Sequence, residues 1–390
     1  MQIIDDIDKY PTPYFIVYED LIRKNLKLID RVRRDAGVEI IMAFKANALW
    51  KTFGTLREFG FSSTASSLNE LKLGNEFLCR KVHSYCPAYT QLTIHEFLKG
   101  SSHITFNSIS QFLQHKATLD EYNATFGKDS DVYVSAGLRV NPQCSVIETD
   151  IYNPALPGSR FGVTADMIGE RLPDGIEGLH FHQLCESTSY DLEKVLDAFK
   201  SQFGKYLSQV KWVNMGGGHL MTREGYDVEH LIKLLKNFKA EFPWLDVILE
   251  PGSAFMWRTG NLISSVVDVV ENQGIKTAII DASFACHMPD TLEMPYMPII
   301  SESVELNHDL PTYRLGGNSC LSGDDKGDWS FPTPLKPGDK ITFEDMNHYT
   351  TVKTHFFNGI QHPNIVFLHS NGTFELLKHY TYEDYKNRMD

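Results

Sequence analysis

The chain has 390 residues, of which 42% are hydrophobic and 22% are charged, and its formal net charge is −13. This length allows two domains, or one large barrel with a smaller partner. The negative charge argues against a nucleic-acid-binding protein, and no stretch is apolar for long enough to predict a membrane-spanning helix.

The N-terminus lacks the basic and apolar segments of a targeting signal, so we expect a cytoplasmic protein. The cysteines lack the short paired spacings that are typical of zinc sites, and in a chain of this size they indicate reduced thiols rather than a disulfide framework. We therefore assign no metal ligand among them. The six cysteines are Cys79, Cys86, Cys144, Cys185, Cys286 and Cys320.

In chain order, the sequence predicts an aromatic-rich strand over 12–18 and a helix over 19–34. Short apolar runs that predict strands then alternate with segments of helical periodicity. The predicted strands are 40–44, 61–65, 82–86, 103–107, 132–140, 176–182, 210–215 and 247–250, and the predicted helices include 67–78, 93–98, 109–119, 192–207 and 228–242. This order is typical of an α/β protein with a parallel (β/α)8 TIM-type barrel.

After Glu250 the pattern changes to period-two runs with turn residues between them. Strands are predicted over 261–270, 276–280, 340–344 and 349–356. We therefore expect a barrel domain over 19–255 and a second, all-β domain, Greek-key-like, over 256–390. The N-terminal segment 1–18 is expected to complete the second domain.

Functional residues of a barrel lie where the strands end, because the active site is built on the C-terminal face. The predicted strand ends carry Lys45, Thr64, Asn107, Arg139, His182, the glycines Gly216, Gly217 and Gly218, and Glu250. Lys45 follows a buried strand, and desolvation with cationic neighbours would turn its amine into a nucleophile. The alternative is a lysine that only extends to water.

The glycines follow the seventh strand, where barrels often bind a phosphate through backbone N–H groups, although a triple glycine also makes an ordinary tight turn. Glu250 ends an apolar strand, and a buried carboxylate needs a partner such as a protonated pyridine nitrogen or Arg139. Lys45, the glycines and Glu250 at one barrel mouth together indicate pyridoxal phosphate, with Lys45 forming the Schiff base.

His180 and His182 lie on the same side of one strand, because side chains alternate with a period of two. A His-x-His pair at a strand end also fits a divalent-metal hydrolase. Amidohydrolases carry this pair on the first strand, whereas here it lies on the sixth. Stacking on a cofactor ring therefore fits His182 better, and His180 fits a core histidine.

Several stretches together resemble the alanine-racemase-like, fold-type III pyridoxal-phosphate decarboxylases, the group of ornithine and diaminopimelate decarboxylases. The matching stretches are Thr12-Pro13-Tyr14-Phe15, Ala43-Phe44-Lys45-Ala46, Phe181 to Glu186, Asn214 to His219, Glu250-Pro251-Gly252 and Gly317 to Asp324. The resemblance extends over nearly the whole chain. It implies a homodimer with two shared active sites.

By this resemblance, Lys45 would hold the cofactor, His182 would stack on its ring, Gly216 to Gly218 would bind its phosphate and Glu250 would pair with its ring nitrogen. Tyr349 would also contact the cofactor. Cys320 and Asp324 would reach the site from the second subunit, with Cys320 as the proton donor.

Two departures from the group narrow the expected substrate. Ser253 stands where the amino-acid decarboxylases usually have an arginine, and Leu321 stands where diaminopimelate decarboxylases have a glutamate. The segment 281–296, which includes Asp281 and Asp290, resembles a branch that acts on longer, polycationic substrates, and its acids suit amines.

We therefore predict a lyase that removes the α-carboxylate of a carboxylated polyamine, with Glu250, Asp281, Asp290, Cys320 and Asp324 as substrate contacts. Three alternatives are a decarboxylase of diaminopimelate, ornithine or arginine, a metal hydrolase that uses His180 and His182, and a non-catalytic cofactor carrier. Such carriers typically lack the C-terminal β domain.

Overall fold

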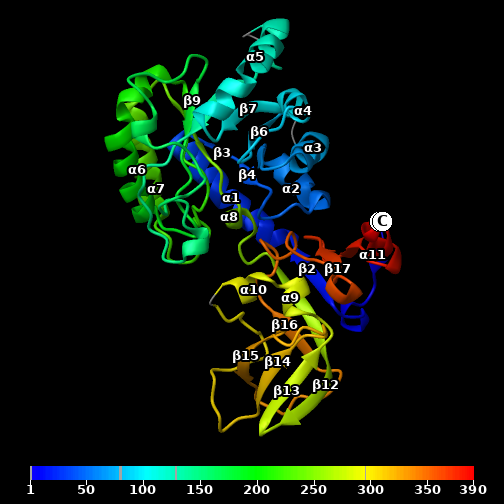
Figure 1. The fold of residues 1–390 in the computed structure, drawn as a ribbon. Helices are drawn as coiled ribbons and strands as arrows, with labels where there is room; N and C mark the ends of the chain where they lie inside the picture. The colour runs from blue at the N-terminus through cyan, green and yellow to red at the C-terminus, as the bar shows by residue number, and fades with distance from the viewer. Residues whose placement is uncertain (1, 79–80, 128–129, 295) are drawn as a thin grey trace. The chain divides into compact units, whose positions relative to one another are not determined.

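The computed structural model describes residues 2–78, 81–127, 130–294 and 296–390. The chain forms two compact units, one of Lys24–Phe255 and one of Met1–Arg23 with Met256–Asp390 (Figure 1). Within the described ranges, no helix combines the length and the apolar character that crossing a bilayer requires.

The first unit contains a parallel sheet that closes on itself. Strand β3 pairs with β11, and β4 pairs with β5, so β3 and β4 are two halves of one strand. Between them, the Ile41 N–H donates to the Leu249 carbonyl at 2.9 Å. The predicted barrel of eight strands is confirmed. Its strands are β3 (Glu39–Ile40), β4 (Met42–Ala43), β5 (Ser63–Ala65), β6 (Val82–Tyr85), β7 (Ser101–Phe106), β8 (Ser135–Arg139), β9 (Gly178–His180), β10 (Trp212–Asn214) and β11 (Asp246–Leu249).

Helices follow the strands, and polar side chains fix where several of them begin. Ser67 accepts from the Glu70 N–H at 3.2 Å, and Thr188 forms a capping box with Asp191. The helices are α1 (Glu19–Ala36), α2 (Phe53–Glu58), α3 (Leu68–Phe77), α4 (Ile94–Gly100), α5 (Ile109–Phe126), α6 (Ser189–Phe203), α7 (Val228–Glu241) and α8 (Ser253–Met256). These caps fix where α3 and α6 begin after their strands.

Trp212 fills the interior of the barrel near the N-terminal ends of the strands. A Cβ atom on Gly137 or Gly178 would lie 2.2 Å or 2.0 Å from its indole ring, so both strands need glycine there. The His103 ring packs edge-on against Trp212, with centroids 5.2 Å apart, and stacks on His83 at 4.1 Å. This end of the barrel is therefore packed, and the open end is the C-terminal one.

The second unit is built on a mixed sheet. Its strand order is β1 (Gln2–Ile4), β18 (Phe374–Lys378), β17 (Asn364–Leu368), β2 (Tyr14–Tyr18), β12 (Gly260–Asn272), β13 (Ile275–Ile280), β14 (Thr312–Gly316) and β15 (Asp325–Ser330), and β16 (Lys340–Phe343) pairs with β12. Strand β2 pairs antiparallel with β12 and parallel with β17. Gln273 and Gly274, both with positive φ, form the tight turn of the β12–β13 hairpin.

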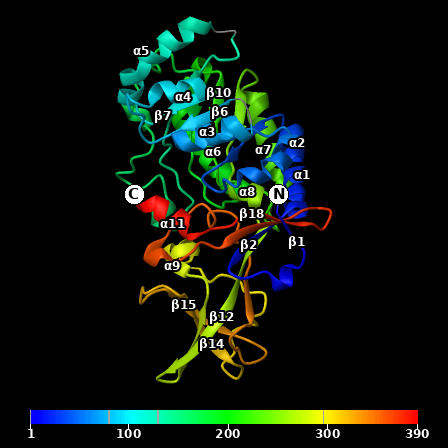
Figure 2. The same cartoon turned by 90° about the vertical axis from the view of Figure 1, so that its right-hand side faces the viewer.

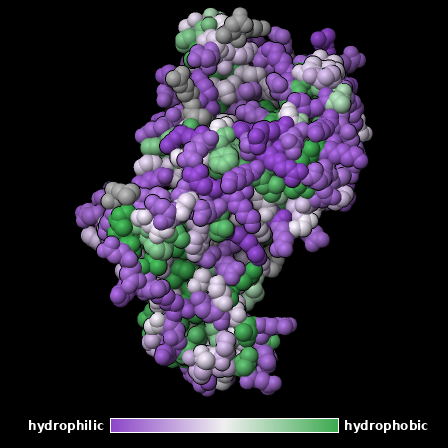
Figure 3. Space-filling view, turned by 180° about the vertical axis from the view of Figure 1, so that it is seen from behind, coloured by the Kyte–Doolittle hydropathy of each residue, from purple (hydrophilic) through white to green (hydrophobic). Residues whose placement is uncertain are grey.

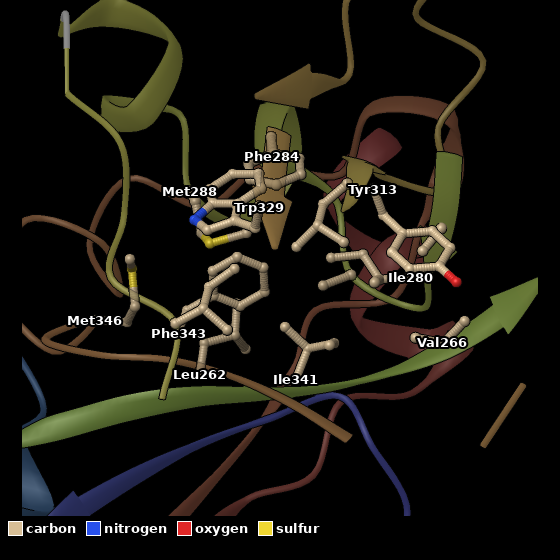
Figure 4. Close-up of a cluster of buried hydrophobic side chains, with 14 of the residues drawn as sticks. Leu262, Val266, Ile280, Phe284, Met288, Tyr313, Trp329, Ile341, Phe343 and Met346 are labelled. Atoms are coloured by element: carbon tan, nitrogen blue, oxygen red, sulfur yellow. The ribbon is translucent and has the colours of Figure 1, made fainter. Parts of the chain in front are cut away.

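Two apolar clusters hold this sheet together. The larger cluster joins side chains of several elements, including Leu262 of β12, Tyr313 of β14, Trp329 of β15 and Phe343 of β16 (Figure 4). Phe284 belongs to the short helix α9 (Phe284–His287), so α9 is fixed to the sheet by this cluster. The smaller cluster contains Ile4, Tyr14, Ile16, Ile263, Val366 and Leu376.

Two short helices complete the second unit. Helix α10 (Asp290–Glu293) follows α9, and α11 (Tyr382–Met389) ends the chain. The Tyr385 ring of α11 lies 6.0 Å from the Phe356 ring, so α11 packs on the segment near residue 356 (Figure 2). The face of the molecule in Figure 3 carries mainly hydrophilic residues with hydrophobic ones interspersed.

The predicted strand over 349–356 is wrong, because this segment forms turns. Tyr349 has a φ of 55°, which a strand does not allow, and the Lys353 N–H donates locally to the Thr350 carbonyl at 3.1 Å. Strands β1, β14, β15, β17 and β18 were not predicted. The described cysteines are free thiols, as expected, and Cys79 lies outside the described residues. The free cysteines are Cys86, Cys144, Cys185, Cys286 and Cys320.

Candidate active site

Four loops at the C-terminal end of the barrel carry the predicted cofactor residues. Lys45 follows β4, His182 follows β9, Gly216 to Gly218 follow β10 and Glu250 follows β11. Because parallel strands end at the same rim, these residues converge although 205 positions separate Lys45 from Glu250 in the sequence.

Lys45 lies beside the His182 ring, with its Nζ 3.4 Å from Nε2. The other ring nitrogen, Nδ1, accepts a hydrogen bond from the Gly217 N–H at 3.2 Å. A neutral imidazole that accepts at Nδ1 carries its proton on Nε2, so Nε2 is the donor toward Lys45. Lys45 accepts this hydrogen bond only as a neutral amine, which is its nucleophilic form.

The environment of Lys45 favours the same form. Its side chain is solvent-exposed, but the surrounding protein still removes water from the amine. This desolvation is the main cause that lowers the pKa of Lys45, and the Arg139 charge lowers it further. Glu250 acts in the opposite direction, but the net pKa is below the ordinary value.

Glu250 is buried, with 5% of its surface exposed. Its Oε1 accepts from Asn214 Nδ2 at 2.7 Å, and its Oε2 lies 3.7 Å from His180 Nε2. Burial raises the pKa of Glu250, while the hydrogen bond from Asn214 and the Lys45 charge lower it. The carboxylate therefore lies in a site where a further cation would stabilise its charged form.

The same residues allow a metal-ion interpretation. One ligand atom each of His180, His182 and Glu250 lie within 4.8 Å of one another, a set that also suits zinc. However, Arg139 acts electrostatically on His182. Its positive charge opposes a divalent cation and favours an anionic ligand.

The three glycines are required by close backbone packing. A Cβ atom on Gly216 would lie 2.6 Å from the Phe181 carbonyl oxygen, one on Gly217 would lie 2.4 Å from the Glu250 carbonyl oxygen, and one on Gly218 would lie 2.2 Å from the Leu184 carbonyl. Gly216 and Gly218 also have positive φ, at 70° and 88°. The loop thus offers only backbone groups to a ligand.

Four further residues lie near this site, and none of them was predicted to bind the cofactor. Arg139 is buried between aromatic rings, with its guanidinium carbon 4.6 Å from the centre of Tyr85 and 4.4 Å from that of Phe161. Its Nη2 donates to the His182 carbonyl at 3.4 Å. Thr64, His180 and Asn214 complete the set. Their positions at strand ends were a usable signal, but their hydrogen-bond partners were not predictable.

The remaining predicted residues belong to the other unit. Cys320 is exposed on the loop between β14 and β15, and its N–H donates to Asn358 Oδ1 at 2.8 Å. Asp324 is buried, and its carboxylate accepts from the Ala285 N–H at 2.8 Å and the Ser319 N–H at 3.1 Å. Asp324 therefore shapes the loop that carries Cys320, and its role as a substrate contact stays a prediction.

Asp281 also makes structural contacts. It accepts from the Ser264 hydroxyl at 2.6 Å, the Ser265 N–H at 2.8 Å and the Thr12 hydroxyl at 2.5 Å. These bonds tie the N-terminal segment to β12 and leave its substrate role a prediction.

Asp290 and Tyr349 have local partners as well. Asp290 forms an ion pair with Lys353, which also pairs with Glu293 at 2.9 Å. The Tyr349 ring packs edge-on against the His348 ring, with centroids 6.1 Å apart. The proposed contacts of Asp290 with substrate and of Tyr349 with cofactor stay predictions.

Comparison with known proteins agrees with the barrel fold. The model of the family described as "Pyridoxal-dependent decarboxylase, C-terminal sheet domain" matches residues 15–347. The chain is 43% identical, over 98% of its length and 96% of the relative's, to a carboxyaminopropylagmatine decarboxylase from Synechocystis. It is 40% identical, over 98% of its length and 99% of the relative's, to a carboxynorspermidine/carboxyspermidine decarboxylase from Campylobacter jejuni.

The solved structures show the same architecture. The crystal structure of carboxynorspermidine decarboxylase with norspermidine from C. jejuni has a TM-score of 0.87 at 38% identity, covering 97% of this chain and all of that one. A diaminopimelate decarboxylase from Helicobacter pylori, at 17% identity and a TM-score of 0.80, shares the fold. The family match and the near-full-length relatives together show that this chain belongs to the pyridoxal-dependent decarboxylases.

Proposed function

We propose that this enzyme binds pyridoxal 5'-phosphate at Lys45 and removes the α-carboxylate from carboxynorspermidine and carboxyspermidine. The products would be norspermidine or spermidine and carbon dioxide, which places the reaction in polyamine biosynthesis. The observation that carries the proposal is the Lys45 amine, whose Nζ lies 3.4 Å from His182 Nε2 and whose pKa is lowered by desolvation, at the barrel rim that also carries the buried Glu250.

The residues at the barrel rim fit this cofactor. Lys45 would bind it covalently, Gly216 to Gly218 would bind its phosphate, His182 would stack on its ring, and Glu250 would hold the proton of the ring nitrogen. The glycine loop, which has no room for a Cβ atom, matches the phosphate of the cofactor. The buried Glu250 carboxylate, which needs a cation, matches its protonated ring nitrogen. When bound, pyridoxal phosphate withdraws the electrons that the lost carboxylate leaves on the α-carbon.

Residues of the second unit would complete the site in a homodimer. Cys320 is an exposed thiol and would deliver the proton to the α-carbon. Asp324 fixes the loop of Cys320 through two backbone N–H groups. Tyr349 would contact the cofactor, and Asp281 and Asp290 would supply negative charge toward the amines of the substrate.

A second substrate has its own support. The Synechocystis relative, at 43% identity, is named for carboxyaminopropylagmatine, whose far end is a guanidinium group instead of an amine. Both kinds of substrate pair an α-amino acid carboxylate with a distant cation. The chain's net charge of −13 favours a substrate with either an ammonium or a guanidinium group at its far end. Which of the two substrates the enzyme prefers therefore has to be measured.

The test compares kcat/KM for carboxynorspermidine, carboxyspermidine and carboxyaminopropylagmatine, with meso-diaminopimelate and ornithine as controls. Released carbon dioxide is measured, and the Lys45→Ala variant gives the background. We expect a kcat/KM for at least one carboxylated polyamine that exceeds those of both controls by at least about 100-fold, equivalent to ~3 kcal/mol. Preference for diaminopimelate or ornithine would contradict the proposed substrate class, whereas preference for carboxyaminopropylagmatine would select the second candidate.

A further inference from the structure

Asn214, at the end of β10, connects two parts of the proposed cofactor site. It is buried, with 2% of its surface exposed. Its side-chain Nδ2 donates to Glu250 Oε1 at 2.7 Å, and its Oδ1 accepts from the Gly216 N–H at 2.8 Å. One amide thus bonds both to the carboxylate and to the first glycine of the loop.

These partners determine the orientation of the amide. A reversed amide would place its oxygen against the Glu250 carboxylate and its NH2 group against the Gly216 N–H, so both hydrogen bonds would become repulsions. The backbone of Asn214 is fixed as well, because its carbonyl accepts from the Phe181 N–H at 2.9 Å. Asn214 therefore presents a rigid donor to Glu250.

Asn214 and Thr64 both hydrogen-bond to Glu250, and Asn214 has the larger effect on its charge. A buried carboxylate oxygen without a donor is costly, and the carboxylate would either take up a proton or attract the Lys45 ammonium. The first outcome removes the negative charge that a ring-nitrogen proton needs. The second keeps Lys45 protonated and non-nucleophilic. The hydrogen bond from Asn214 is the largest of the effects that lower the pKa of Glu250.

We infer that Asn214 is a positioning residue that holds Glu250 charged and correctly turned while it anchors the glycine loop. This inference rests on the proposed function. It assigns to Asn214 no contact with substrate, so its substitution should change kcat and cofactor binding far more than KM.

The first experiment compares two variants of the holoenzyme. Asn214→Ala removes both hydrogen bonds, whereas Asn214→Asp keeps an acceptor for the Gly216 N–H but gives Glu250 no donor while ionised. We expect both variants to lower kcat by about 10- to 100-fold, the range for losing a buried hydrogen bond to a charged group. KM should change by less than about threefold. Full activity in Asn214→Asp would show that only the bond to Gly216 matters and would overturn the inference.

The second experiment is a double-mutant cycle with Glu250→Gln. If Asn214 acts through Glu250, Asn214→Ala in the Glu250→Gln background should cost less than about threefold in kcat. The dissociation constant of pyridoxal phosphate, measured by titration of the apoprotein, should rise in Asn214→Ala in both backgrounds, because the hydrogen bond from the Gly216 N–H is lost in both. Equal factors in kcat in both backgrounds would overturn the inference.

Asn123→Ala is the matched control. Asn123 of α5 also uses both atoms of its amide, donating to the Val134 carbonyl and accepting from the Val134 N–H, each at 2.9 Å. Its loss should lower the melting temperature and leave kcat and cofactor affinity unchanged. If the wild-type enzyme binds the cofactor and decarboxylates but the cycle is additive, this inference alone is overturned. If the wild type neither binds the cofactor nor decarboxylates, the proposed function is overturned as well.

Discussion

Lys45 and Glu250 show how position in the barrel sets the chemistry of a side chain. Both lie at the rim, where burial opposes charge and thus lowers the pKa of the amine while raising that of the carboxyl group. Glu250 limits the fall in the pKa of Lys45, and Lys45 limits the rise in the pKa of Glu250. The pair therefore supplies an amine that loses its proton more readily than a free lysine, beside a carboxylate that a further cation would stabilise.

Glu250→Gln should keep the cofactor bound but lower kcat by on the order of 100-fold or more, because an uncharged amide does not hold a proton at a ring nitrogen. Steady-state kinetics and cofactor content, measured on the same preparation, check this. Glu177→Gln is the control. Glu177 lies just before β9, at the end of that strand opposite the rim, and its carboxylate accepts a hydrogen bond from the Ser135 hydroxyl at 2.7 Å. A normal kcat in Glu250→Gln would mean that Glu250 is only structural.

At the scale of elements, the glycine loop can be tested by adding a single methyl group. The Cβ of Gly217→Ala would lie 2.4 Å from the Glu250 carbonyl oxygen, and this is backbone that does not move easily. We expect a destabilisation of about 1–3 kcal/mol and a cofactor affinity at least about tenfold weaker. Thermal unfolding and a cofactor titration measure the two effects.

Gly204→Ala is the matched substitution in the same unit. Its Cβ would meet no atom within 4 Å, and its φ is −53°, so both stability and cofactor binding should stay near wild type. Equal behaviour of the two variants would exclude tight packing as the reason for the glycines after β10.

The stacked histidines of β6 and β7 should make the stability of the barrel depend on pH. Burial lowers the pKa of His83 from 6.5 to about 4, so the unfolded chain takes up this proton more readily than the folded one. The contribution of neutral His83 to the free energy of unfolding is complete above pH 6.5 and is lost as the pH falls toward 4. The whole effect of His83 is roughly 3 kcal/mol.

Urea unfolding at pH 7 and pH 4.5 measures this dependence. In His83→Gln, which cannot titrate, the difference in unfolding free energy between the two pH values should shrink by roughly 2 kcal/mol. An unchanged difference would assign the acid sensitivity to other groups.

The sequence predicted the barrel well because short runs that predict strands alternate with segments of helical periodicity. Lys45 and His182 could be found because each lies just past the end of a strand. The role of Asn214 could not be predicted, since it depends on a side-chain amide that joins two loops.

The second unit was predicted less completely for physical reasons. Strand β15 (Asp325–Ser330) alternates poorly and contains Gly327 with a φ of 80°. Strand β17 (Asn364–Leu368) is buried over four successive residues, so it has no period-two signal. The segment after β16 is rich in β-branched and aromatic residues, which favour a strand, but Tyr349 adopts a left-handed conformation that no pattern indicated.

At the scale of the whole molecule, the proposed homodimer predicts complementation. If Cys320 of one subunit serves Lys45 of the other, a Lys45→Ala/Cys320→Ala hybrid has one intact site. Random mixing makes half of the dimers hybrid, so activity should return to about a quarter of wild type. The mixture is compared with the sum of the two parents after co-refolding, because Cys320→Ala can keep residual activity through another donor.

Mixing Lys45→Ala with Glu250→Gln is the control. Both substitutions fall in the barrel half of the shared site, so no dimer of this mixture has an intact site and no activity should return. If verified Lys45→Ala/Cys320→Ala hybrids show no gain over their parents, the sites are not shared between subunits.

The central claim, that Lys45 carries the cofactor of a decarboxylase, is tested most directly by borohydride reduction followed by peptide mapping. The purified protein should show a cofactor absorption band that reduction abolishes, and the reduced cofactor should then be found covalently on the peptide that contains Lys45. Lys45→Ala should fold, since its exposed side chain adds little packing, but should carry no label and release no carbon dioxide. An active wild-type enzyme with its label on another lysine, or with none, would contradict the account.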